Sequence, residues 1–283
     1  MYQKYVSVHG GHSGQFCLHA KNRLEDIIKR YIELEFTWVG ITEHSPPVTD
    51  QLRYPDEAEA GISANFLFKQ FENYMSECRR LQKKYASKIK IFTGIETETY
   101  SGYKNFIKDV VRRFRPDYIV GSVHHVDDMC MDFSRELYEK AAKAVGGYDA
   151  MYCRYFDEQY EMIKALDPAV IGHFDLVRLF DPDYKKRIRK KKIWQRILRN
   201  LELIKDRELI MDFNLRALYK GANEPYITED ILRKAKELEI AVVPGDDSHG
   251  IDQVGINMER GLKILHQHGF DAPWPTPRLY LWD

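Results

Sequence analysis

Short runs of β-branched and aromatic residues alternate along the chain with longer segments in which apolar residues recur at helical spacing. A short apolar run bounded by turn residues is typical of a strand, whereas ten or more residues at helical spacing indicate a helix. We therefore expect strands at residues 5–9, 37–44, 89–97, 117–124, 169–175, 209–214 and 240–246. We expect helices at residues 23–35 with Asn22 as N-cap, 63–85, 103–114, 135–164 with a break near Gly146-Gly147, 188–205, 228–238 and 258–268.

The order of these elements predicts the fold class. Seven strand-then-helix units without strand-strand hairpins favour parallel pairing, with the helices outside the sheet. Because no glycine-rich dinucleotide loop follows the first strand, we expect a closed α/β barrel rather than an open doubly wound sheet. The length of 283 residues suits one large α/β domain or two small ones. We expect a single domain over residues 1–283.

Composition and charge argue against several classes of protein. Lys plus Arg and Asp plus Glu both number 43, a balance that indicates neither a nucleic acid nor a membrane surface as partner. No apolar run approaches the roughly 18 residues of a membrane helix. The first expected strand begins too close to Met1 for a secretion signal, and the four cysteines form no CxxC pair. We therefore expect reduced thiols and a cytoplasmic protein.

Potential metal ligands and polar groups gather at the carboxyl ends of the expected strands, where barrel enzymes carry their catalytic residues. The histidines His266 and His268 lie instead on the last expected helix, where a solvated or capping role is expected. Cys17, between His12 and His19, is either a soft metal ligand or a small buried side chain. The groups at the strand ends are His9 with His12, His44, Glu96, His124 with His125, His173, Asn214, and Asp247 with His249.

So many imidazoles and carboxylates buried side by side would leave charges and polar groups uncompensated without a cation. Neutral imidazole with a few carboxylates suits zinc, iron or manganese, whereas calcium or magnesium would require a mostly oxygen shell. The ligands are too many for one ion, so we expect two or three divalent ions with at least one bridging carboxylate. Such a cluster lowers the pKa of a shared water molecule and stabilises a phosphoryl or acyl transition state. The residues alone therefore indicate a multinuclear metallohydrolase.

Six motifs identify a resemblance that covers nearly the whole chain. They are HSGQFCLHA, GITEHSPP, GIETE, GSVHH, VIGHFDLVRLF and GDDSHGIDQVG. In this order and spacing they closely resemble the polymerase-and-histidinol-phosphatase (PHP) superfamily, and within it the monofunctional histidinol-phosphatases. The segments YPDE, MDF, YFDEQYEM and NEPY are similar to this branch rather than to the polymerase-associated one.

The resemblance implies a distorted seven-stranded, TIM-like βα barrel that holds three metal ions. It also implies hydrolysis of a small phosphomonoester, L-histidinol phosphate, to L-histidinol and inorganic phosphate in histidine biosynthesis. Matched motif by motif, His9 and His12 bind the first ion together with Glu96 and Asp247. Glu96 bridges to a second ion held by His124 and His173, and the third site is formed by His19, His44 and His249.

Two departures from the family pattern affect this assignment. The first motif is usually His, any residue, His, whereas this chain reads His9-Gly10-Gly11-His12. The glycines allow a bulge through which His9 still reaches the first ion; otherwise His9 packs below the site. After the sixth strand, relatives have Asn, two small residues and then Arg, whereas this chain has Asn214-Leu215-Arg216 and then Tyr219. The expected contacts to substrate there differ from the family pattern.

Other residues have expected roles in binding and catalysis. Arg178 is the first candidate for the phosphate clamp, followed by Arg53, Arg216 and the amide of Asn214; for each arginine the alternative is a surface salt bridge. Glu96, Asp247 and His249 are expected at the reacting centre, and Asp175 either orients the imidazole of His173 or protonates the leaving group. Glu43, Glu98 and Asp246 are expected to support ligands or to be solvated. The segment from Gln51 to Gly61 is a candidate lid that meets the amino end of the substrate.

The basic run from Lys185 to Lys192 keeps a second class of function open. Its expected role is a solvated helix face, but it would also suit a nuclease or nucleotide phosphoesterase that uses the same metal cluster. A metal-holding regulatory protein without activity is a third alternative. Phosphate release from small esters and from DNA distinguishes among the three.

Overall fold

The computed structural model describes residues 5–282 and contains one sheet of seven parallel strands. Several strands are shorter than the apolar runs that predict them, because the ladder ends where side chains turn into the site. In sheet order they are β1 (Val6–Ser7), β2 (Trp38–His44), β3 (Lys90–Glu96), β4 (Tyr118–Gly121), β7 (Val170–Ile171), β8 (Ile210–Asn214) and β9 (Ala241–Gly245).

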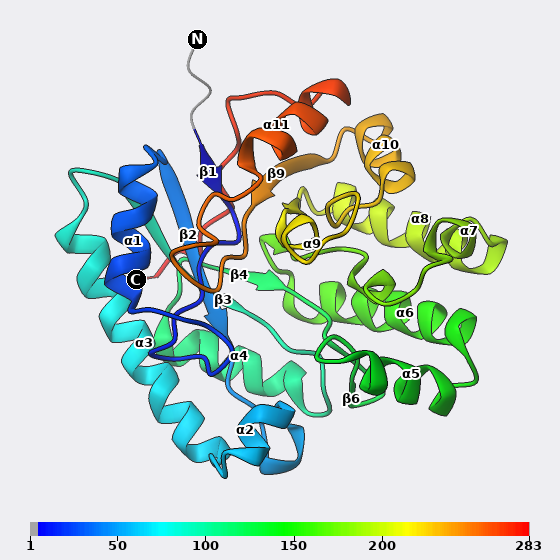
Figure 1. Cartoon of the computed structure of the whole chain (residues 1–283), viewed down its shortest axis with the longest axis horizontal. Coiled ribbons are helices and arrows are strands. Elements are labelled where there is room, and N and C mark those ends of the chain that lie inside the picture. Colours follow the sequence, from blue (N-terminus) through cyan, green and yellow to red (C-terminus); the bar gives the residue numbers. More distant parts are fainter. Residues whose placement is uncertain (1–4, 283) are drawn as a thin grey trace.

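The first and last strands close the sheet into a barrel. Val8 N donates a hydrogen bond to Pro244 O at 3.0 Å, and Asp247 N donates to His9 O at 2.9 Å. The first bond joins the residue after β1 to Pro244 of β9, and the second joins residues beyond both strands. The two strands are seen side by side in Figure 1. The predicted seven-stranded barrel is confirmed, and its distortion comes from this irregular seam.

Helices surround the strands, as Figure 1 shows, with α1, α3 and α4 on one side and α6 and α8 on the other. Each long helix buries an apolar stripe against the barrel. The long helices are α1 (Leu24–Glu33), α3 (Ala64–Lys84), α4 (Tyr103–Phe114), α5 (Arg135–Ala144), α6 (Tyr148–Leu166), α8 (Lys191–Asp206), α10 (Glu229–Glu237) and α11 (Met258–Gln267). Shorter turns of helix are η1 (Asp50–Leu52), α2 (Pro55–Glu59), η2 (Leu176–Arg178), α7 (Tyr184–Ile188) and α9 (Arg216–Tyr219).

A tyrosine fills the barrel below the strand ends. Tyr118 is fully buried, and its hydroxyl donates a 2.5 Å hydrogen bond to Val8 O across the interior. Gly40 on β2 leaves room for this ring, since a Cβ there would lie 1.6 Å from the Tyr118 hydroxyl oxygen. The close packing forms a solid floor on which the strand-end side chains are held.

Three details differ from the expected elements. The helix expected at 188–205 is α8, which begins at Lys191, and a separate short helix, α7, precedes it with no Gly or Pro between the two. Arg23 rather than Asn22 is the N-cap of α1; Asn22 has φ of 67° and its side-chain oxygen accepts a hydrogen bond from Ile251 N. A hairpin of β5 (His125–Val126) and β6 (Met129–Cys130) follows β4, whereas we expected strand-then-helix units with no hairpin among them.

Among residues 5–282, none of the helices combines the length and the apolar character that a membrane span requires.

Candidate metal centre

Glu96 lies at the centre of the strand-end residues. Its carboxylate is almost completely buried at the end of β3. Oε1 lies 2.9 Å from His173 Nε2 and 3.2 Å from His124 Nε2, while Oε2 lies 3.2 Å from His9 Nε2. The register of β2 and β3 pairs His44 with Glu96, which places His44 Nδ1 3.2 Å from Oε2. One carboxylate thus faces four imidazoles that arrive from four different strands.

A second group of ligand atoms adjoins this carboxylate. His12 Nε2 lies 3.3 Å from Asp247 Oδ1 and 3.6 Å from Glu96 Oε2. Each of the nine predicted ligands belongs to at least one set of three whose ligand atoms lie within 4.8 Å of one another. The sets are His9, His12 and Glu96; His9, His173 and Asp247; His12, His44 and His249; His44, Glu96 and His124; and His19, His44 and Cys17.

The first predicted departure from the family pattern does not remove His9 from the cluster. The Gly10 backbone approaches the β2 strand closely, with Gly10 N donating to Gly40 O at 2.8 Å. A Cβ on Gly10 would lie 2.4 Å from that same oxygen, so only glycine fits. The loop therefore turns tightly, and His9 points inward next to Glu96.

Backbone strain marks two of the strand ends. His173, after β7, has φ of 21°, and Asp247, after β9, has φ of 44°. Residues with side chains rarely adopt this left-handed region unless the surrounding structure compensates, and such residues are concentrated at functional sites. Both side chains point into the cluster as a result of this turn.

A carboxylate or carbonyl behind the ring holds several of the imidazoles in one orientation. Nδ1 of His9 lies 2.9 Å from Asp212 Oδ2, and Nδ1 of His12 lies 2.9 Å from Glu43 Oε1. Nδ1 of His124 lies 2.9 Å from Glu98 Oε2. This is the arrangement in which a carboxylate fixes the tautomer of a metal-binding imidazole, leaving Nε2 as the free ligand atom.

The unpartnered atoms of the cluster fit a bound cation. Within the described part of the chain, His9 Nε2, His12 Nε2, His44 Nδ1 and Asp247 Oδ1 are buried and have no hydrogen-bond partner. Buried polar atoms are normally paired, so their convergence calls for a positive ion between them. Imidazole nitrogens with a few carboxylate oxygens suit divalent ions such as zinc.

The pKa shifts of the ligand residues also indicate that this cluster favours positive charge. Burial disfavours the charged form of His124, but Glu98 and Glu96 outweigh it and raise its pKa well above the usual value. For Glu96, burial is outweighed by His9, His44 and His124, which hold its pKa well below the usual value. Burial, Arg216 and His12 lower the pKa of His249, which keeps that imidazole neutral.

The cluster forms the floor of an open pocket. Its lining includes Glu96, His124, His173, Asp247 and His249 on the floor. Around them lie two cationic side chains, a further carboxylate and several rings. These additional lining residues are Arg216, Lys220, Asp132, Phe133, Leu176, Tyr54 and Tyr226.

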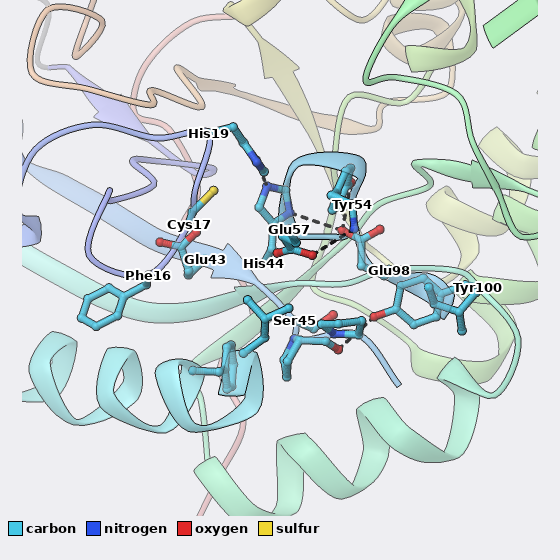
Figure 2. A pocket seen from close by; sticks show the side chains of 15 residues that line it. Phe16, Cys17, His19, Glu43, His44, Ser45, Tyr54, Glu57, Glu98 and Tyr100 are labelled. Atoms are coloured by element: carbon cyan, nitrogen blue, oxygen red, sulfur yellow. Dashed lines mark hydrogen bonds and ion pairs between the residues drawn. The ribbon is translucent and has the colours of Figure 1, made fainter. Parts of the chain in front are cut away.

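A second cavity adjoins this pocket and shares His19, His44 and Tyr54 with it. Figure 2 shows His19 and His44 pointing toward each other at its edge, with Cys17 nearby. The segment from Gln51 to Gly61 supplies Leu52, Tyr54 and Glu57 to this cavity. The expected lid therefore lies beside the site, formed by η1 and α2.

Two predicted roles do not agree with the structure. The Arg178 guanidinium is buried away from the pocket lining, where it donates to Asp175 Oδ2 at 3.2 Å and to Pro225 O at 2.6 Å. Asp175 in turn accepts a hydrogen bond from Thr228 N at 2.9 Å, and its carboxylate does not contact the His173 imidazole. Asp175 and Arg178 thus anchor the loop before α10 rather than the substrate or the leaving group.

The other arginine and carboxylate candidates divide into two groups. Arg53 donates hydrogen bonds to the carbonyl groups of Asp50 and Ile62 and does not line the pocket. Arg216 does line the pocket, and it donates a hydrogen bond to Asp247 O at 3.0 Å. Asn214 lies below the pocket, where its amide donates to Asp247 Oδ2 at 3.1 Å. The remaining carboxylates, Glu43, Glu98 and Asp246, are buried; the first two face ligand imidazoles, and Asp246 bonds Tyr31 and Ser7 instead.

The sequence reasoning missed three residues at the site. Asp212 is a fully buried carboxylate on β8, and its signal is an acidic residue between the apolar Met211 and Phe213 of a strand. Lys220 lies four positions after Arg216 and lines the same pocket. Asp132 lies within the MDF segment, which carried a family resemblance but no assigned role.

Comparisons with known proteins agree with this geometry. The PHP domain family matches residues 10–216 of the chain. A protein named probable histidinol-phosphatase from Schizosaccharomyces pombe is 38% identical over 94% of this chain and 88% of its own length. A histidinol phosphatase structure from Listeria monocytogenes has a TM-score of 0.80 and 26% identity, covering 90% of this chain and 99% of that one.

One further solved structure has the same fold with bound ligands. It is a histidinol phosphate phosphatase of Lactococcus lactis in complex with zinc, L-histidinol and phosphate. Its TM-score to this chain is 0.76 at 17% identity, and the match covers 99% of this chain and 100% of that one.

Proposed function

This chain belongs to the PHP domain family, and we propose that it hydrolyses L-histidinol phosphate to L-histidinol and inorganic phosphate with the help of divalent metal ions. The observation that supports this most is the convergence of nine ligand side chains, Glu96 among them, at the mouth of the barrel. The 38% identity to a probable histidinol-phosphatase supports the choice of substrate.

The proposed ligands are those expected from the sequence, in two or three ion sites. His9, His12, Glu96 and Asp247 would hold the first ion, His124 and His173 would hold a second that shares Glu96, and His19, His44 and His249 would hold the third. When bound, such ions provide a water nucleophile near neutral pH and positive charge to offset the phosphoryl charge. Zinc, iron and manganese all suit these ligands.

The chain's own residues prepare the site for this chemistry. Asp212, Glu43 and Glu98 keep the Nδ1 atoms of three imidazoles engaged, so each Nε2 stays directed at the centre. Arg216 and Lys220 add positive charge beside the cluster, where a phosphate dianion would be attracted. Arg216 replaces Arg178 as the first candidate for the phosphate clamp because it faces the pocket.

The nuclease alternative loses its main support in the structure. The basic run at 185–192 is largely neutralised by neighbouring carboxylates rather than exposed as a cationic surface. Lys190 pairs with Asp149 at 2.6 Å, and Arg189 pairs with Asp230 at 2.6 Å. Lys185, Lys186 and Arg187 pair with Glu224, Asp183 and Asp181.

A substrate panel tests this proposal. Purified protein reconstituted with zinc, iron(II) or manganese is assayed for released phosphate with histidinol phosphate, other small phosphomonoesters and single-stranded DNA. We expect the highest kcat/KM with histidinol phosphate. Activity on DNA without activity on small esters would refute the proposal.

A further inference from the structure

Three segments that resemble histidinol-phosphatases, but have no ligand role, meet at the same pocket. Tyr54 comes from YPDE, Asp132 and Phe133 come from MDF, and Tyr226 comes from NEPY. They reach the pocket from the loops after β2, β4 and β8. Because these residues do not belong to the metal ligands, their shared position indicates contact with the substrate.

Asp132 differs from the other carboxylates of this pocket. Glu96 and Asp247 also line it, but both are engaged by imidazoles of the cluster. Asp132 Oδ1 accepts a 3.4 Å hydrogen bond from the Cys130 thiol. Among residues 5–282, Asp132 forms no ion pair with a lysine or arginine, and Lys220 of the same pocket acts on it only electrostatically. The carboxylate is therefore available to a cation that enters the pocket.

The β5–β6 hairpin holds Asp132 in place. Its turn residues, Asp127 and Asp128, have φ of 48° and 63°, as tight hairpin turns require. Asp128 accepts hydrogen bonds from the backbone and hydroxyl of Ser101, both at 2.6 Å. Beyond the hairpin, the buried Met131 donates from its backbone to His124 O at 3.0 Å. The residue before Asp132 is thus hydrogen-bonded to the backbone of His124, a proposed metal ligand.

The segment is also fixed on its other side. Ser134 caps α5, with its hydroxyl accepting a 3.2 Å hydrogen bond from Leu137 N. Between these two anchors, Phe133 is 43% exposed even though it lines the pocket. A large apolar ring at a rigid position provides a surface on which a flat ring of a ligand can pack.

The pocket therefore carries groups of both signs of charge. Arg216 and Lys220 provide positive charge, the metal cluster forms the floor, and Asp132 provides negative charge beside the Phe133 ring. Histidinol phosphate has the complementary pattern, because its phosphate is anionic, the carbon next to its ester methylene carries an ammonium group, and its side chain ends in an imidazole ring.

We propose that Asp132 is the specificity-determining residue that pairs with the ammonium group of the substrate, while Phe133 packs against the imidazole ring. This inference rests on the proposed function and extends it, since it explains preference for an amino alcohol phosphate over other phosphomonoesters. Asp132 takes no part in the reaction at phosphorus. Its loss raises KM for the amino substrate, because the same contact exists before and during the reaction.

The test compares two esters that differ only in the ammonium group: histidinol phosphate and 3-(imidazol-4-yl)propyl phosphate. Three proteins are compared with both esters: the natural protein, Asp132→Asn and the matched control Glu136→Gln. Glu136 lies in the first turn of α5, is exposed and does not line the pocket, so this control makes the same charge change outside the site. Inhibition by inorganic phosphate is measured with all three proteins to verify that the metal floor is intact.

We expect Asp132→Asn to lower kcat/KM for histidinol phosphate by about 10- to 100-fold, mostly through KM. With the analogue that lacks the ammonium group, the same variant should remain within about 3-fold of the natural protein, and Glu136→Gln should match the natural protein with both esters. An equal loss with both esters, or no loss at all, would overturn the role of Asp132 and leave the proposed function standing. If the natural protein hydrolysed p-nitrophenyl phosphate but neither imidazole ester, the proposed function would fail, and the role of Asp132 with it.

Discussion

His9 Nδ1 lies 2.9 Å from Asp212 Oδ2, although 203 positions separate the two residues in the chain. Both side chains are fully buried, and Asp212 also receives a 2.9 Å hydrogen bond from the Asn214 amide. The pair connects the first motif to the sixth strand of the barrel. It fixes His9 with Nε2 directed at Glu96, 3.2 Å away.

Asp212→Asn should weaken metal binding without removing a ligand. The amide can no longer stabilise the same imidazole orientation, and loss of such a supporting partner typically costs about 10- to 100-fold in metal affinity. Competition with a chromophoric chelator measures this directly. Asp206→Asn, an equal change at the exposed end of α8, is the control and should leave the affinity unchanged.

Glu96→Ala should abolish turnover and lower the metal content. The Glu96 carboxylate faces four imidazoles. Its removal takes away the negative charge that two neighbouring metal cations require between them. His266→Ala should change neither property, because His266 is an exposed side chain of α11 paired with Asp271. Phosphate release and elemental analysis of both variants check the prediction, and equal behaviour would show that the site is assigned wrongly.

Gly40→Ala should destabilise the barrel by about 1–3 kcal/mol, because the new methyl group would meet the Tyr118 hydroxyl at 1.6 Å. Tyr118→Phe alone should cost about 1 kcal/mol through the lost hydrogen bond to Val8 O. The double variant should lose less stability than the sum of the two single losses, since removal of the hydroxyl relieves the closest contact and leaves only the milder one to Tyr118 Cζ at 2.8 Å. Urea unfolding of all four proteins measures this coupling, and strict additivity would contradict it.

Glu158→Gln should change how stability depends on pH. Burial raises the pKa of Glu158 to about 7 in the folded protein, and its Oε2 has no hydrogen-bond partner. Since the unfolded chain has a pKa near 4.5, the folded state binds more protons between about pH 4.5 and 7 and loses stability as the pH rises through that range. The variant avoids this loss. On going from pH 4 to pH 8, its free energy of unfolding should gain about 1–2 kcal/mol relative to that of the natural protein.

Unfolding in urea at several pH values measures this difference. Glu161→Gln is the control on the same helix, because Lys164 lowers the pKa of Glu161 and the sign of its pH dependence is opposite. A constant difference between Glu158→Gln and the natural protein at all pH values would contradict the prediction.

The sequence predicts which residues meet at the strand ends because this depends only on the direction of the strands. Strands of a parallel barrel all end at one mouth, so His44, Glu96, His173 and Asp247 meet there whatever their spacing along the chain. The long helices follow from apolar periodicity, and Tyr103–Phe114 forms a helix with the predicted bounds. Both features depend on local patterns that repeat many times.

Other features depend on a single contact and leave little trace in the sequence. The β5–β6 hairpin has strands of two residues each, too short for an alternating pattern. Arg178 follows a family motif closely, yet the carbonyl groups of Glu224 and Pro225 capture its side chain across the fold. Asp132 lies outside the expected strands and helices, and only the folded chain brings it to the pocket of the proposed metal ligands.

The central claim is that strand-end imidazoles and carboxylates hold a cluster of ions around Glu96. Elemental analysis of the reconstituted, extensively dialysed protein tests it most directly. We predict two to three equivalents of divalent metal per chain in the natural protein and a clear loss in Glu96→Ala. Fewer than two equivalents in the natural protein, or an unchanged content in the variant, would contradict the claim.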